Sequence, residues 1–219
     1  MNRESKIIAI VLMVLVSLLV AGLRFYTKRK LRASFESGNF EEYQSFLDSS
    51  LVKIYIRPYQ RELSRLTGYL AAMDNEGTDR QIRYMLEDIN TTSKQKAEIA
   101  SRGFYHYLSV EDFKRAGDMF KAIEENKQEV PDYSTISLMN DIFVLKKADH
   151  IDTLKKNIEV LKKQEDEDGH IKQNIGIFEY LIAIQYQNKK QFTEMRKYLE
   201  SSLEKCKGTP YEGRIRRLL

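Results

Sequence analysis

The residue types that perform most protein chemistry are few and scattered in this sequence. Its histidines, His106, His150 and His170, lie far apart, and none has a second histidine or a cysteine at the spacing of a zinc site. The single cysteine, Cys206, excludes an intramolecular disulfide and a cysteine-rich metal site. The acidic run at 165–168 lacks the alternating ligands of a calcium-binding loop, and we interpret it as a charged loop between helices. We therefore expect no metal.

The sequence also contains none of the short motifs that mark dinucleotide binding, nucleotide-phosphate binding, serine hydrolases or zinc peptidases. Because catalysis has to be argued from a site, we expect a protein that is not an enzyme and that holds no cofactor. The alternative is an accessory subunit, or a divergent enzyme whose site is assembled from scattered residues.

The net charge of +4 is concentrated near the N-terminus. Once the first 32 residues are set aside, acidic residues slightly outnumber basic ones. One alternative function is a helical-repeat protein that binds nucleic acid. Such a protein would need a basic surface, which this charge balance disfavours, so we expect no nucleic-acid partner. Local basic runs, such as Arg214, Arg216 and Arg217, are interpreted as a solvated helix face.

The N-terminal segment predicts a membrane anchor. Residues 7–23 carry no charge, and Phe25 and Tyr26 extend the apolar stretch. As a helix, residues 7–26 span roughly 30 Å, the thickness of a bilayer core. We therefore expect a short tail at 1–6, a single transmembrane helix in the lipid bilayer at 7–26 and a basic juxtamembrane segment at 27–32. The alternative is a cleaved signal peptide with its cut near 20–22.

The cations that flank this segment predict its orientation. Those that follow it are Arg24, Lys28, Arg29, Lys30 and Arg32. They outnumber the cations that precede it, so the positive-inside rule places the following domain in the cytoplasm. The same cluster would attract anionic lipid headgroups.

The remainder, residues 33–219, shows amphipathic helices and no strand-like alternation. A helix, a short polar break and a second amphipathic helix recur along the chain. The second helices align on starts at residues 40, 79, 110, 151 and 192. Such spacing predicts stacked helical hairpins, about five in number, because one hairpin cannot bury its apolar face alone.

The last hairpin resembles tetratricopeptide repeats. The matching residues are Ile182, Ala183 and Tyr186 in its first helix, Phe192, Met195 and Leu199 in its second, and Pro210 beyond. The small residue that the family has in its second helix is replaced by larger ones throughout, so the match is degenerate. The resemblance implies an all-α fold in which the transmembrane helix precedes a right-handed α-hairpin solenoid. It also implies that the first helices line a concave surface.

Two of these first helices carry more apolar residues than one buried face requires. By the same resemblance, the residues expected at a partner-binding groove are Arg102, Tyr105, Met139, Phe143, Ile177, Tyr180 and Ile184. The alternative is that the apolar stripes pack between neighbouring hairpins as core. We expect a membrane-anchored scaffold or adaptor that binds a protein or peptide partner, itself membrane-associated.

Overall fold

In the computed structural model, residues 3–166 and 169–219 are described, and their side chains from residue 12 onward and at Ile10. The chain is all-helical across these ranges. It divides into two compact units, Met1–Ile99 and Ala100–Leu219. The first unit holds α1 (Arg3–Glu36), α2 (Phe40–Leu47), α3 (Ser50–Tyr55), α4 (Pro58–Ala71), α5 (Asn75–Glu87) and the start of α6 (Ser93–Ser109). The second holds the end of α6, then α7 (Phe113–Glu125), η1 (Lys127–Glu129), α8 (Tyr133–Met139), η2 (Asn140–Val144), α9 (Ile151–Leu161), α10 (His170–Asn188), α11 (Phe192–Lys205) and α12 (Pro210–Leu218).

Local signals set many of the helix starts. The side chains of Asn39, Asp74 and Asp112 accept hydrogen bonds from backbone amides in the first turns of α2, α5 and α7. Such caps satisfy donors that have no partner inside the helix. Pro58 and Pro210 occupy the first turns of α4 and α12, where a missing N–H costs nothing.

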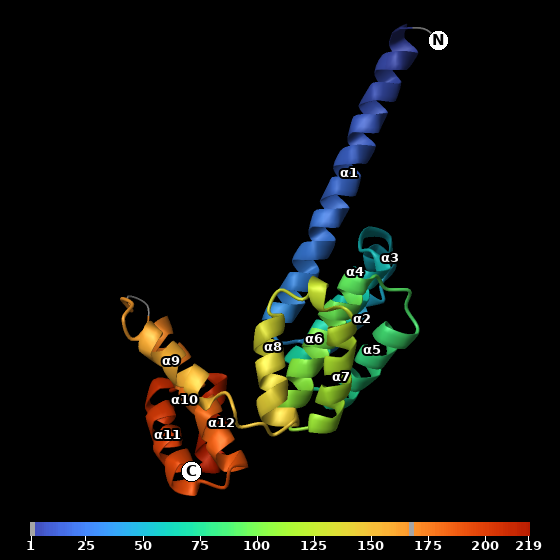
Figure 1. Ribbon diagram of the computed structural model, residues 1–219. Helices are drawn as coiled ribbons and strands as arrows, with labels where there is room; N and C mark the ends of the chain where they lie inside the picture. Colours follow the sequence, from blue (N-terminus) through green and yellow to red (C-terminus); the bar gives the residue numbers. More distant parts are fainter. Residues whose placement is uncertain (1–2, 167–168) are drawn as a thin grey trace. The chain divides into compact units, whose positions relative to one another are not determined.

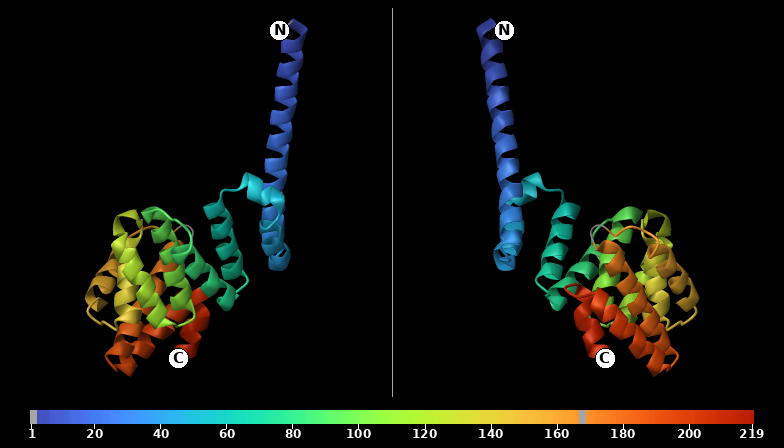
Figure 2. Two further views of the ribbon diagram at one scale, coloured as in Figure 1. Left: turned by 90° about the vertical axis from the view of Figure 1, so that its right-hand side faces the viewer. Right: turned by 90° about the vertical axis from the view of Figure 1, so that its left-hand side faces the viewer.

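In the first unit, the C-terminal part of α1 packs against α2 and α3. The buried residues of this core are Leu31, Tyr43, Leu47 and Val52. Helix α4 then packs against α2 and α5, and Gly68 lets the Tyr43 ring approach the α4 backbone closely. Both views in Figure 2 show that α1 continues well beyond the part that contacts α2 and α3.

The prediction of a transmembrane helix at 7–26 is wrong. Among the residues whose side chains are described, no helix is long and apolar enough to cross a bilayer. The single-pass topology and the placement derived from the flanking cations are corrected with it.

In the second unit, α10 is the central element and lies beside α9 and α11, as Figure 1 shows. Most residues of α10 from Ile175 to Gln185 are buried, including Leu181, Ile182 and Ala183. The backbone of Gly176 lies against the end of α11, and the Ser202 hydroxyl donates a hydrogen bond to the Gly176 carbonyl at 2.7 Å.

The expected hairpin starts agree with the structure in part. Helices α2, α9 and α11 begin at residues 40, 151 and 192, as their apolar patterns predict, whereas α5 and α7 begin at Asn75 and Phe113. Helices α3 and α12 and the π-helix η2 were not expected. The α-helices described range from 6 residues in α3 to 34 in α1. A regular repeat is therefore not shown, and the right-handed solenoid is not supported.

Candidate functional site

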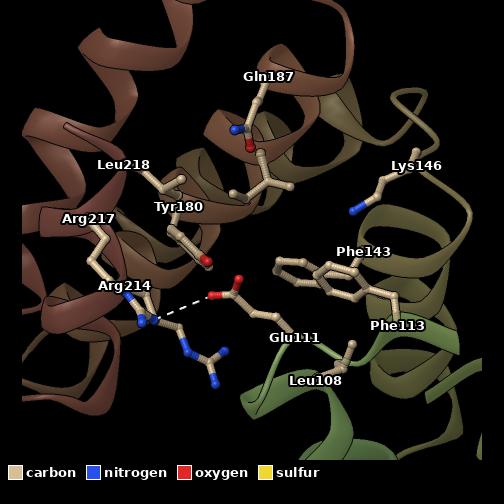
Figure 3. Close-up of a pocket in the computed structure, with 11 residues that line it drawn as sticks. Leu108, Glu111, Phe113, Phe143, Lys146, Tyr180, Gln187, Arg214, Arg217 and Leu218 are labelled. Carbon is tan, nitrogen blue, oxygen red and sulfur yellow. Dashed lines mark hydrogen bonds and ion pairs between the residues drawn. The ribbon is translucent and has the colours of Figure 1, made fainter. Parts of the chain in front are cut away.

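The second unit contains a cavity of about 400 Å³ in which apolar and charged side chains meet. Figure 3 shows side chains from α6, α7, η2, α10, α12 and the connecting turns around it. Its lining residues are Leu108, Glu111, Phe113, Phe143, Lys146, Tyr180, Ile184, Gln187, Arg214, Arg217 and Leu218. Residues far apart in the sequence thus meet around one space.

A second cavity, of about 280 Å³, adjoins the first. It is lined by Tyr105, Leu108, Met139, Phe143, Pro210, Tyr211 and Arg214. Leu108, Phe143 and Arg214 line both spaces, so the two form one open depression with two compartments. We call these two cavities together the central cleft.

Aromatic rings form much of the cleft's surface. The ring centroids of Phe143 and Tyr180 lie 6.1 Å apart, and those of Tyr180 and Tyr211 lie 5.6 Å apart in an edge-to-face arrangement. Tyr180 is 4% exposed and Ile184 is 6% exposed, and both belong to the core around α10. Burial raises the pKa of the Tyr180 hydroxyl, which therefore stays protonated at neutral pH and can donate a hydrogen bond.

Charged groups stand around this apolar surface. The Arg217 guanidinium lies 3.4 Å from the Glu111 carboxylate, and this contact joins residues that are 106 positions apart. The Lys146 ammonium lies 3.9 Å from the centroid of the Phe113 ring. Burial lowers the pKa of Lys146, since a partly desolvated ammonium is less favourable.

Two left-handed residues bring the acidic and one of the basic groups to the cleft. Glu111 has φ +61° in the turn between α6 and α7, and Lys146 has φ +56° directly after η2. The Asp112 amide donates to the Tyr107 carbonyl at 2.9 Å, and the Lys147 amide donates to the Asp141 carbonyl at 2.8 Å, so both turns cap a helix end. Glycine is the usual residue for this conformation, so each of these turns carries backbone strain.

The structure brings together five of the residues expected at a groove. Tyr105, Met139, Phe143, Tyr180 and Ile184 all line the central cleft. Burial and a hydrogen bond that its hydroxyl donates to Asp132 raise the pKa of Tyr105. Tyr180 and Ile184 belong to the core and also line the cleft. The groove interpretation and the core interpretation of these residues therefore each describe part of their environment.

The remaining predicted residues lie elsewhere. Arg102 is not among the lining residues, and Ile177 is half-buried against the α10 core. Of the cations after the apolar segment, Lys30 lies 3.6 Å from Glu42, and Arg32 lies 2.7 Å from Glu36. The others, Arg24, Lys28 and Arg29, are exposed on α1.

Sequence reasoning missed the cleft residues from α12 and from the two capping turns. Arg214 and Arg217 are part of a basic run that was interpreted as a solvated face. The only sequence signal was that run, because nothing in the local pattern connects α12 with the turn at Glu111. The contact between them depends on how α12 packs against α10 and α11.

A third cavity, of about 450 Å³, lies among α9, α10 and α11 and includes Lys155, Lys162 and Lys197. Two of these lysines already have partners. Lys162 lies 2.7 Å from Glu159, and Lys155 donates to the Tyr186 hydroxyl at 3.1 Å. Its inner wall includes Glu179, whose carboxylate is paired with Lys205 at 3.0 Å. These contacts leave less uncompensated charge there than at the central cleft.

The described residues contain no group of three or more histidine, cysteine or acidic side chains that could hold a metal ion. His150 contacts the Asp141 carboxylate at 3.0 Å, and Lys147 pairs with the same carboxylate at 2.7 Å, so these polar side chains are engaged with one another beside η2. Burial raises the pKa of the Cys206 thiol, so this cysteine is not activated as a thiolate.

Neither a family model, nor a curated protein, nor a solved structure matches this chain. The tetratricopeptide-like character of the last hairpin thus stays a resemblance in sequence. The central cleft is the feature from which a function can be inferred.

Proposed function

We propose that the second unit is a protein-interaction module that holds a peptide segment of a partner protein in the central cleft. The observation that carries this proposal is the two-compartment depression that joins the end of α6, η2, α10 and α12. Half-buried Phe143, Tyr211 and Arg214 stand together in its wall. Aromatic and arginine side chains in a concave site are the groups that contribute most to the affinity of protein interfaces.

The two adjoining compartments favour a chain-like ligand. Each is large enough for one or two side chains, and Leu108, Phe143 and Arg214 stand where they meet. A peptide can place neighbouring side chains in both compartments while its backbone runs across the opening. The role is one of binding, without a catalytic step, and it fits a scaffold or adaptor.

The test is a selection of peptides from a random displayed library on the full-length protein. The enriched peptides are then measured by fluorescence anisotropy against wild type and two matched variants. Phe143→Ala removes a ring shared by both compartments. Phe192→Ala removes an exposed ring on α11 outside the cleft.

We expect Phe143→Ala to weaken binding by about tenfold or more, as for a central interface aromatic, and Phe192→Ala to leave it unchanged. Circular dichroism and thermal melting must show that the Phe143→Ala protein is still folded at the assay temperature. The proposal fails if no peptide is enriched, or if folded Phe143→Ala binds the enriched peptides as tightly as wild type.

A further inference from the structure

We infer that the peptide held by the central cleft is acidic, and that Glu111 occupies the position of its carboxylate while the cleft is empty. This inference rests on the proposed function and specifies its ligand. Figure 3 shows the Glu111 side chain between Tyr180, Arg214 and Arg217, inside the space that a ligand would fill.

Charge complementarity selects an anionic partner. The first compartment is lined by the cations Lys146, Arg214 and Arg217 and by a single carboxylate, Glu111. Among the described residues, neither Arg214 nor Lys146 forms an ion pair. A carboxylate of an incoming peptide would therefore meet unpaired cations beside apolar walls, where charge interactions are screened less than in bulk water.

The contact between Glu111 and Arg217 is weak enough to be exchanged. Its 3.4 Å separation is longer than the distance of a strong charge-assisted hydrogen bond. The two side chains are 62% and 66% exposed, and ion pairs with such exposure contribute little to stability. Replacing the internal carboxylate with that of a peptide thus loses little.

The second compartment indicates which kind of side chain lies next to the acidic residue in the bound peptide. Apart from Arg214, its walls are Tyr105, Leu108, Met139, Phe143, Pro210 and Tyr211. These walls suit a large apolar side chain. Because Arg214 lines both spaces, an acidic residue and an apolar residue that are neighbours in the peptide would each meet a matching surface.

The test uses two labelled synthetic peptides and the full-length protein. In one peptide phenylalanine and leucine alternate with glutamate, and in the other glutamine replaces every glutamate. Binding is measured by fluorescence anisotropy for wild type, Arg217→Gln and Glu111→Gln. The matched controls are Arg196→Gln and Glu200→Gln, since this pair on α11 has nearly the same exposure, 67% and 60%, and lies outside the cleft.

We expect wild type to bind the glutamate peptide about tenfold more tightly than the glutamine peptide, because charged hydrogen bonds exceed neutral ones. Arg217→Gln should remove most of that preference. Glu111→Gln should strengthen binding of the glutamate peptide by about two- to fivefold, the scale of one exposed ion pair, and leave the glutamine peptide unaffected. Neither control variant should change either affinity, and the preference should shrink as salt is raised.

Equal affinity for the two peptides would overturn the inference, as would a Glu111→Gln variant that binds the glutamate peptide no better than wild type. Both results are distinct from failure of the proposed function. If the displayed library yields peptides without acidic residues, and Phe143→Ala abolishes their binding, then the cleft binds peptides and only the acidic specificity is wrong.

Discussion

At the scale of single residues, burial decides what a charge contributes. The Glu62 carboxylate is buried in the first unit, where Arg61, Arg65 and Gln81 donate hydrogen bonds to it at 2.9, 3.1 and 3.1 Å. Removing one partner of such a group leaves a desolvated charge, which is costly. Glu111 is the opposite case, because water can replace its contact with Arg217. The same residue type therefore stabilises the fold at Glu62 and stays available for exchange at the cleft.

The N-terminal cap of α7 should make the free energy of unfolding depend on pH. Asp112 accepts a hydrogen bond from the Arg115 amide at 3.0 Å, and this bond, together with the Arg115 guanidinium, holds the pKa of the Asp112 carboxyl below its usual value. A carboxyl whose pKa is lower in the folded state stabilises the protein above its unfolded pKa, and this contribution disappears as the pH falls through the folded pKa. We expect Asp112→Ala to lower the free energy of unfolding by about 1 kcal/mol at pH 7.

This difference between Asp112→Ala and wild type should begin to shrink below about pH 4, where the carboxyl becomes protonated in the unfolded state, and should be lost as the pH falls through the lower pKa of the folded state. Urea denaturation at a series of pH values measures it. Asp112→Asn is the control, because asparagine also caps a helix but does not titrate, so its stability relative to Asp112→Ala should not change with pH. A cost of Asp112→Ala that is constant down to pH values well below 4 would contradict the role of the ionised cap.

At the scale of helices, close approach depends on a missing side chain. A Cβ at Gly176 would lie 2.7 Å from the Cys206 sulfur and 2.8 Å from the Lys205 Cβ, so the end of α11 could not keep its place against α10. Gly213 on α12 has no neighbouring atom within 4 Å of such a Cβ. The two helical glycines therefore differ in what an added methyl group would meet.

We expect Gly176→Ala to lower the free energy of unfolding by roughly 1–2 kcal/mol, because overpacking outweighs the better helix propensity of alanine. Gly213→Ala should instead raise it by up to about 1 kcal/mol, since only the propensity changes. Thermal and urea unfolding of both variants measures the difference. Equal stabilities for the two variants would mean that α10 and α11 are not as close as the structure places them.

At the scale of the whole molecule, each of the two units has its own core. Leu47 is fully buried in the core of the first unit, and Leu199 is fully buried in the core around α10. Because these residues belong to separate clusters, a cavity made in one should leave the packing of the other intact. We therefore expect each unit to have its own free energy of unfolding.

Leu47→Ala and Leu199→Ala should each lower the local free energy of unfolding by about 2–5 kcal/mol, the cost of removing a buried leucine. Hydrogen exchange followed by mass spectrometry can localise the effect. Leu47→Ala should accelerate exchange in α2 and α4, and Leu199→Ala should do so in α10 and α11. Uniform acceleration along the whole chain in either variant would show that the units unfold as one.

The sequence by itself determined the features that depend on neighbours along the chain. Amphipathic spacing and polar breaks indicated helices, and the starts at residues 40, 151 and 192 agree with α2, α9 and α11. Leu199, which the sequence placed in the second helix of the last hairpin, is fully buried. Helix propensity, capping and periodicity act over a few residues, so a linear reading can recover them.

Tertiary structure alone decided where the helices meet. It placed Tyr180 both in the core and at the cleft, and it brought Arg217 to Glu111 across 106 positions of sequence. The apolar N-terminal stretch suggested a membrane span, but within the described side chains no helix meets the length and hydropathy of one. A site formed by distant helices depends on their packing angles and close contacts, and those follow from the fit of whole surfaces, which no local pattern records.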